Sequence, residues 1–352
     1  MVLKQDPNQS YRAVISPISE DVTRPLWSVM IPTYNCAEYL RQTLASVLAQ
    51  DPGAEVMQIQ VVDDHSTRDD PEAVVQELGQ GRVEFYRQPQ NMGYIHNFET
   101  CLQRSRGQII HLLHGDDYVL DGFYQHLQQG FEQHPEIGAA FCRHLYVDEQ
   151  GTVEASSPLE LPTRGLLPQW LERIACGQRL ATPSIAVRRS VYEQLGGFDH
   201  RFVCAGEDWE MWVRIAAHYP VWFEPETLAA YRVTRAGSLT AGTARNHRLV
   251  QDMRKATEII ESFLPNYLPP RKARQLTGWA RRMYASWALG TAEKLLAVQD
   301  WQGAIGPTRE ALRCSHAPRV LGAVLLLYGQ IQLSSLQQRM RQFWKSSWRQ
   351  AS

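Results

Sequence analysis

Two adjacent carboxylates, Asp116 and Asp117, follow the apolar run Ile109–Leu113 after a gap of only two residues. Like charges this close repel one another, and burying both is unfavourable unless a cation lies beside them. Mg²⁺ and Mn²⁺ prefer hard oxygen ligands, and they bind through few carboxylates together with substrate phosphates. The pair therefore predicts a divalent metal site. An acidic turn that caps the next helix is the alternative interpretation.

A second pair, Asp63 and Asp64, closes the apolar run Ile59–Val62. A carboxylate at the end of a strand can accept hydrogen bonds from a nucleobase N–H or from ribose hydroxyls. Ser66 and Asp69 follow, and this composition also fits a capped helix start. The pair alone leaves both interpretations open.

A third pair, Glu207 and Asp208, begins a segment with helical periodicity. Trp209, Trp212 and Val213 fall on one face of the predicted helix, which places the two acids at its N-terminus. The helix macrodipole favours the ionised carboxylate there. An ionised carboxylate that faces a ligand can take a proton from an alcohol. Simple N-terminal capping is the alternative.

Short apolar runs that alternate with helical segments must position these acids. The runs are rich in β-branched residues and predict five strands, separated by four helices. The strands are expected at 28–31, 59–62, 83–86, 109–113 and 139–142, and the helices at 38–49, 72–78, 97–104 and 123–133. This alternation predicts an α/β fold with a mostly parallel sheet and helices on both faces. Ligands of such sheets bind beyond the carboxyl ends of the strands, so the polar clusters after the first four strands are expected to meet there.

Composition excludes several classes of protein. A formal net charge of -1 gives no bias toward nucleic acid. No G-x-G-x-x-G motif follows the first strand, which argues against a nicotinamide-dependent dehydrogenase. The six cysteines form no C-x-x-C pair, and this favours a reducing compartment over a disulfide framework or a zinc site. The N-terminus lacks a signal-peptide run, and the apolar run Ala323–Tyr328 is too short to span a bilayer, so a cytoplasmic location is expected.

The chain is expected to have three parts, which are an N-terminal extended arm (1–26), the α/β domain (27–243) and a helical C-terminal region (244–352). No Asp or Glu occurs after Glu310, and the segment Leu333–Arg349 can form a basic amphipathic helix. Such a helix suits peripheral contact with an anionic membrane surface. Packing of its apolar stripe on the preceding helices is the alternative.

Five motifs occur in this order along the chain: Pro32-Thr33-Tyr34-Asn35, Val62-Asp63-Asp64-x-Ser66, Asn91-x-Gly93, Gly115-Asp116-Asp117, and Gly196-Gly197-Phe198 followed by Gly206-Glu207-Asp208. Their order resembles that in the family 2 glycosyltransferases of GT-A fold, and the resemblance extends from about Trp27 to Thr240. Each motif is weak alone, but the ordered set is specific. The resemblance implies a Rossmann-like GT-A domain. It also implies inverting transfer of a sugar from a nucleotide-diphosphate donor to an acceptor hydroxyl, in polysaccharide, glycolipid or glycoconjugate synthesis.

The resemblance also assigns roles to the acids. Asp63 or Asp64 would contact the nucleoside, and Asp208, from the pair with Glu207, would be the catalytic base. Ribose and a Mg²⁺ or Mn²⁺ ion would be held by Asp116 and Asp117. The other positions matched to the nucleotide site are Pro32, Tyr34, Asn91 and His96.

Three positions depart from the family pattern. His114 stands where many members have the first acid of D-x-D-D, His96 stands where an Arg often occurs, and Thr234 stands where a third metal ligand, a histidine, often occurs. These departures leave open which of the two acids after Gly115 binds metal. They also leave a non-catalytic sugar-nucleotide-binding or scaffolding relative as the alternative to an enzyme. The acceptor would be a saccharide or a lipid-linked molecule, and the latter would suit docking at the inner membrane surface.

Overall fold

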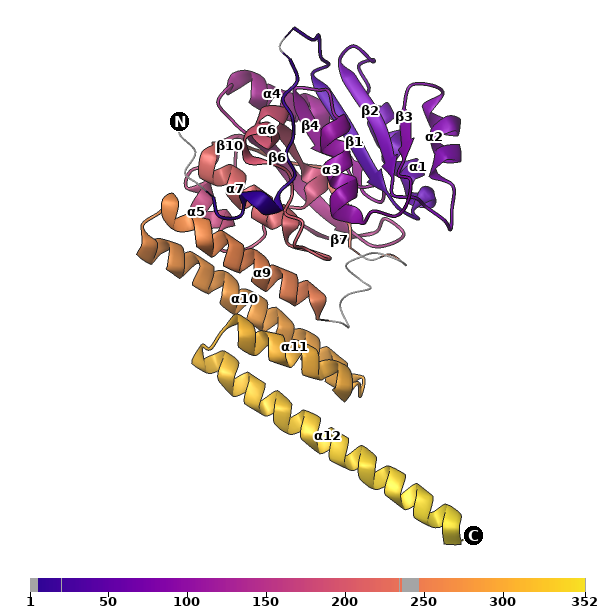
Figure 1. Ribbon diagram of the computed structural model, residues 1–352, viewed down its shortest axis with the longest axis vertical. Helices are drawn as coiled ribbons and strands as arrows, with labels where there is room; N and C mark the ends of the chain where they lie inside the picture. The colour runs from indigo at the N-terminus through magenta and orange to yellow at the C-terminus, as the bar shows by residue number, and fades with distance from the viewer. Residues whose placement is uncertain (1–5, 20, 234, 236–246, 352) are drawn as a thin grey trace. The chain divides into compact units, whose positions relative to one another are not determined.

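The computed structural model describes residues 6–19, 21–233, 235 and 247–351. The chain divides into two compact units. The first comprises residues 1–202 and 207–241, and the second comprises residues 203–206 and 242–352. Figure 1 shows the strands in the indigo to pink part of the chain and the long helices in the orange to yellow part.

The first unit is built on one ten-stranded sheet. Its strands are β1 (Trp27–Thr33), β2 (Met57–Asp63), β3 (Glu84–Arg87), β4 (Ile109–Leu112), β5 (Tyr118–Val119), β6 (Ala139–Val147), β7 (Val153–Ser156), β8 (Gly165–Leu166), β9 (Ile185–Arg188) and β10 (Val221–Arg232). The order is β3-β2-β1-β4-β9-β6-β10-β5, with β7 beside β6 and β8 beside β10. The five predicted strands are all present.

The sheet has a parallel half and a mixed half. Strands β3, β2, β1 and β4 are parallel to one another, as predicted. Strand β9 runs antiparallel between β4 and β6, while β6 and β10 are parallel. The α/β fold class is confirmed, and the antiparallel pairings of the second half were not predicted.

Helices cover both faces of the sheet, as expected. They are α1 (Ala37–Leu48), α2 (Pro71–Gly79), α3 (Tyr94–Arg104), α4 (Phe123–Gln133), α5 (Trp170–Ile174), α6 (Arg189–Leu195) and α7 (Glu207–His218). Successive side chains of a strand point to opposite faces. On β1, Trp27, Val29 and Ile31 join a core cluster with residues of α1, α2 and α4. Met30 is buried outside that cluster, and α3 contacts β1, β2 and β4.

The described part of the N-terminal arm packs against the first unit. A short 3₁₀ helix at Gln9–Tyr11 precedes a segment without helix or strand, in which Ala13 and Ile15 are buried. The backbone N–H of Gly197 donates to Ala13 O at 2.8 Å, and that of His200 donates to Tyr11 O at 2.9 Å. The arm is therefore part of the folded unit, which its lack of periodicity did not indicate.

The second unit is helical, as expected. Its helices are α9 (Arg248–Phe263), α10 (Pro270–Ala297), α11 (Trp301–Cys314) and α12 (Pro318–Ala351), and α10 packs against the other three. Within α12, Pro318–Leu336 is long and apolar enough to cross a membrane, by length and composition alone. The length predicted from the uninterrupted run Ala323–Tyr328 was too short. Neutral Gly, Gln and Ser residues interrupt that run, but they add no charge to the longer apolar stretch.

Candidate active site

The loops after β1, β2, β3 and β4 meet at the carboxyl edge of the parallel half-sheet. The N–H of Gly115 donates to Pro32 O at 3.0 Å, and the N–H of Asp64 donates to Thr33 O at 2.9 Å. A side chain at Gly115 would collide with Thr33, because an added Cβ would lie 2.7 Å from Thr33 Oγ1. The predicted convergence of the polar clusters is therefore confirmed by hydrogen bonds between the loops.

Asp63 and Asp64 are buried and join these loops. Asp63 accepts from Ser66 Oγ at 2.5 Å and from Arg87 Nε at 2.7 Å. Asp64 accepts from the backbone N–H groups of Met92 and Gly93 at 2.7 and 3.0 Å. Gly93 has φ +86°, a conformation that glycine adopts easily, and it is the N-cap residue of α3.

The capping alternative for Asp63 and Asp64 is wrong. Helix α2 begins at Pro71, and its cap is Asp70, whose side chain accepts from Ala73 N. The buried pair instead shapes the wall of the candidate site. Its contact with a nucleoside stays a prediction.

The four other residues expected in the nucleotide site lie on these same loops or next to them. Pro32 is buried at the end of β1, whereas Tyr34 is 42% exposed. Asn91 Nδ2 donates to Asp64 O at 3.2 Å. His96 is exposed on α3 and contacts Glu99. Thr234 lies outside the described residues, so the position of the missing histidine is not described.

Asp116 and Asp117 differ in their surroundings. Asp117 is buried, and its Oδ1 accepts from the backbone N–H of Arg232 at 2.8 Å. Asp116 is partly exposed and pairs with Arg235, whose Nε lies 2.5 Å from Asp116 Oδ2. Neither acid caps the next helix, because α4 begins at Phe123 with Gly122 as its N-cap and no side-chain cap. The capping alternative is therefore wrong here as well.

The donor set at this point fits a hard divalent cation. Among the described residues, Asp117 Oδ2 is one of the few buried side-chain oxygens without a hydrogen-bond partner. Ligand atoms of His114, Asp116 and Asp117 lie within 4.8 Å of one another. Burial and the charge of Asp116 raise the pKa of Asp117, and a bound cation would remove that repulsion. In this structure Arg235 supplies the positive charge beside Asp116, and no local sequence pattern indicated this role.

His114 lies close to both acidic pairs. Its ring stacks on Phe98 with the centroids 5.0 Å apart, and its Nδ1 lies 3.5 Å from Asp117 Oδ2. Although burial lowers the pKa of this imidazole, nearby Asp117, Asp116 and Glu207 raise it overall. The acids around the residue that replaces the first acid of D-x-D-D therefore favour its protonated form.

Glu207 and Asp208 form the first turn of α7, as predicted. Tyr94 Oη donates to Glu207 Oε2 at 3.1 Å. Asp208 Oδ1 accepts from Trp209 N at 2.7 Å, and its Oδ2 accepts from Gln178 Nε2 at 2.5 Å. Sequence reasoning missed Gln178, which lies 30 positions away from its partner.

The macrodipole argument for these two acids needs a correction. Burial is the largest influence on both groups, and it raises the pKa of Glu207 and of Asp208. The negative charge of Asp208 raises the pKa of Glu207 further. The N–H donors of Trp209 and Gln178 favour the ionised form of Asp208, so a proton shared by the pair is expected on Glu207.

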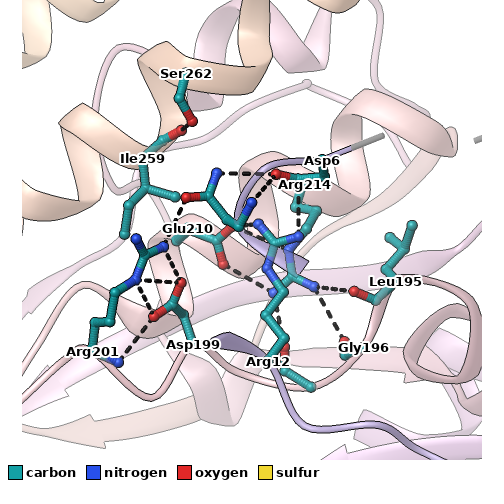
Figure 2. A network of polar contacts seen from close by, with 12 residues as sticks. Asp6, Arg12, Leu195, Gly196, Asp199, Arg201, Glu210, Arg214, Ile259 and Ser262 are labelled. Carbon is teal, nitrogen blue, oxygen red and sulfur yellow. Dashed lines mark hydrogen bonds and ion pairs between the residues drawn. The ribbon is translucent and has the colours of Figure 1, made fainter. Parts of the chain in front are cut away.

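A buried network of ion pairs holds α7, the helix that begins with Glu207 and Asp208. Figure 2 shows Arg12 and Arg214 converging on Glu210. Arg12 Nη2 and Arg214 Nη2 each lie 2.9 Å from a Glu210 oxygen, and Arg214 Nη1 also donates to Leu195 O at 2.6 Å. Removing one member of such a buried group leaves an uncompensated charge, so the network holds α7 in one place.

Comparisons with known proteins agree with this geometry. The model of Glycosyl transferase family 2 matches residues 28–196. An uncharacterized protein of Mycobacterium tuberculosis is 29% identical over 271 residues, or 71% of this chain and 81% of that protein. An uncharacterized glycosyltransferase of Mycoplasma pneumoniae is 32% identical over 149 residues, or 39% of this chain and 50% of that protein. O-antigen biosynthesis protein RfbC of Myxococcus xanthus is 28% identical over 213 residues, or 55% of this chain and 16% of that protein.

Two solved structures share the fold. Staphylococcus aureus TarS 1-349 in complex with UDP-GlcNAc has a TM-score of 0.63 at 16% identity, over 90% of this chain and 91% of that one. The mannosyltransferase PcManGT from Pyrobaculum calidifontis, in complex with GDP-Man and Mn²⁺, has a TM-score of 0.52 at 19% identity, over 93% and 90%. These similarities identify the fold as GT-A. Together with the match of residues 28–196 to Glycosyl transferase family 2 and with the ordered acidic motifs, they support a family 2 glycosyltransferase domain in this part of the chain.

Proposed function

We propose that this protein is a metal-dependent, inverting glycosyltransferase that moves a sugar from a nucleotide-diphosphate donor to an acceptor hydroxyl. The observation that carries the proposal is the meeting of two acidic pairs around His114. His114 Nδ1 lies 3.5 Å from Asp117 Oδ2, and the nearby charges of Asp116 and Glu207 also raise the pKa of this imidazole. One pair can hold a cation and a diphosphate while the other deprotonates the acceptor.

The donor would lie along the loops after β1 to β4. The partly exposed Tyr34 ring offers a face for a nucleobase, with Asn91 and the walls built by Asp63 and Asp64 beside it. Asp116 and Asp117 would hold Mg²⁺ or Mn²⁺, which neutralises charge on the departing diphosphate. The related structures with UDP-GlcNAc and with GDP-Man and Mn²⁺ support this class of donor and metal.

Asp208 would act as the base. Its raised pKa brings it closer to neutral pH, where general bases work best, and Gln178 and Trp209 N hold its two oxygens. The acceptor hydroxyl loses its proton to Asp208 as its oxygen attacks the anomeric carbon. The bond from that carbon to the diphosphate breaks in the same step, so the configuration inverts.

A panel of nucleoside-diphosphate sugars, each incubated with the protein and Mn²⁺, tests the proposal through release of the nucleoside diphosphate. We expect release from at least one sugar nucleotide, accelerated by the correct saccharide or lipid-linked acceptor. Binding of a sugar nucleotide without any turnover would instead favour the non-catalytic relative. The tight pairing of Asp208 with Gln178 argues for a catalytic arrangement, because it positions a carboxylate that binding alone does not need.

We further propose that the protein is cytoplasmic and contacts the inner membrane surface through α12. Leu325 and Leu326 are 73% and 72% exposed within the apolar stretch Pro318–Leu336. The chain after this stretch is basic, with no Asp or Glu. Exposed leucines followed by basic residues suit an anionic lipid surface, where a lipid-linked acceptor would also lie.

Sedimentation with phosphatidylglycerol vesicles tests this contact. The wild-type protein is expected to sediment with the vesicles at low salt, and a Leu325→Glu/Leu326→Glu variant is expected to remain in the supernatant. Val298→Glu is a matched control, because Val298 is 69% exposed but lies outside α12. Equal sedimentation of all three proteins, or of none, would contradict a role for these leucines.

A further inference from the structure

Three metal-ligating side chains outside the acidic pairs converge at the surface of the first unit. His96 and Glu99 lie on α3 one turn apart, and His200 follows the Gly196-Gly197-Phe198-Asp199 motif. Their ligand atoms all lie within 4.8 Å of one another. Segments more than 100 positions apart thus bring two imidazoles and one carboxylate to a single point.

The distances fit a small ion with tetrahedral ligands. His96 Nδ1 lies 3.2 Å from Glu99 Oε2, and His200 Nε2 lies 3.1 Å from the same oxygen. Ligands that bind Zn²⁺ at about 2.0–2.1 Å in a tetrahedron are roughly 3.3 Å apart. The two imidazole rings are also close, with centroids 4.9 Å apart.

The neighbouring groups hold these ligands in place and leave one side open. Gln103 Nε2 donates to the other oxygen of Glu99 at 3.3 Å, so the second carboxylate oxygen is engaged. The backbone N–H of His200 donates to Tyr11 O at 2.9 Å. The His96 and His200 side chains are 50% and 34% exposed, which gives an ion access and room for a water as the fourth ligand.

We infer that His96, Glu99 and His200 form a Zn²⁺ site that is distinct from the acidic site of the proposed reaction. Two imidazoles and a carboxylate are a ligand set that suits Zn²⁺ and related transition ions, whereas Asp116 and Asp117 offer only oxygen ligands that suit Mg²⁺ or Mn²⁺. A Zn²⁺ ion here ties α3 to the segment around His200. The same helix carries Tyr94, which donates to Glu207, so the ion stiffens one support of the catalytic pair.

Co²⁺ absorption spectroscopy of the full chain, after removal of metals with EDTA, tests the site. Co²⁺ is a spectroscopic probe for Zn²⁺, and its visible bands report nitrogen and oxygen ligands. We expect one Co²⁺ per chain at this site, displaced by Zn²⁺, and a higher melting temperature in Zn²⁺ than in EDTA. His200→Asn, His96→Asn and Glu99→Gln should each weaken Co²⁺ and Zn²⁺ binding by at least about tenfold.

Two matched variants separate this site from the alternatives. In His134→Asn the substituted histidine has one ion-pair partner among the described residues, Glu136. Asp117→Asn changes the acidic site instead. Both variants should keep the Co²⁺ spectrum. Equal melting temperatures in EDTA would show that the variants are folded. Wild-type affinity in His200→Asn and Glu99→Gln, or no Co²⁺ binding by the wild type, would overturn the inference. If glycosyl transfer were absent while the Co²⁺ spectrum was present, the result would count against the proposed function and not against the Zn²⁺ site.

Discussion

Asp208→Asn is expected to lower glycosyl transfer by ~10²-fold or more while donor affinity stays nearly unchanged. The substitution keeps the shape of the side chain and removes its ability to take a proton. Because Asp208 contacts neither Asp116 nor Asp117 in any described hydrogen bond or ion pair, the donor and metal site should remain intact. Initial rates and donor titrations on the same preparation measure both quantities.

Glu207→Gln is the matched control for this prediction. Burial and the charge of Asp208 raise the pKa of Glu207, so at neutral pH its protonated form is favoured and a neutral amide resembles it. Gln can also still accept the hydrogen bond from Tyr94 Oη. We therefore expect Glu207→Gln to retain most of the activity. The reverse pattern, an active Asp208→Asn and an inactive Glu207→Gln, would move the role of base to Glu207.

The rate should also depend on pH in a defined direction. A base acts only when it is ionised, so transfer should be full above the pKa of Asp208 and should fall as the pH drops through it. Burial raises that pKa above the ordinary aspartate value, so the loss should begin nearer to neutral pH than for an exposed aspartate. An acid limb of the rate profile that persists in Asp208→Asn would contradict this assignment.

Asp117→Asn is expected to abolish the effect of Mn²⁺ on donor binding. Asp117 Oδ2 is buried without a hydrogen-bond partner, and an amide nitrogen in its place cannot bind the cation. The fold should persist, because Asn can still accept from the backbone N–H of Arg232. Calorimetric titration of the donor in Mn²⁺ and in EDTA should give two different affinities for the wild type and one low affinity for the variant.

Arg235→Gln provides a control of opposite sign. Arg235 neutralises Asp116 in this structure, so a metal ion must compete with its guanidinium for that carboxylate. Removing the guanidinium should strengthen binding of Mn²⁺ alone, whereas Asp117→Asn should weaken it. Weaker Mn²⁺ binding in Arg235→Gln would show that Arg235 supports the metal instead of competing with it.

The parallel half of the fold could be predicted because its signals are local. Strands β1, β2 and β4 are short and largely apolar, β3 overlaps the run at 83–86, and the polar clusters that follow these strands lie at one edge of the sheet. Asp116, Asp117, Glu207 and Asp208 could be singled out for the same reason, since adjacent acids after an apolar run or before a helix are visible in the sequence. Strand β9 has only four residues, and its antiparallel position between β4 and β6 has no local signal.

The contacts that complete the site could not be predicted, because they join distant positions. Arg235 and Asp116 are 119 positions apart, and Arg12 and Glu210 are 198 apart. The sequence marks neither arginine as different from others on the surface. Burial raises the pKa of Glu207 and of Asp208, and this effect opposes the macrodipole argument that the helix start suggests.

The most direct measurement of the central claim is release of nucleoside diphosphate from a sugar nucleotide that the wild-type protein binds, with an acceptor present, in Mn²⁺ and in EDTA. The acidic site predicts rapid release in Mn²⁺ and little release in EDTA, with Asp208→Asn slow in both. Asp208→Asn should nevertheless bind the donor in Mn²⁺ as the wild type does. Equal release in Mn²⁺ and EDTA would contradict the metal site, and wild-type release by Asp208→Asn would contradict the assigned base.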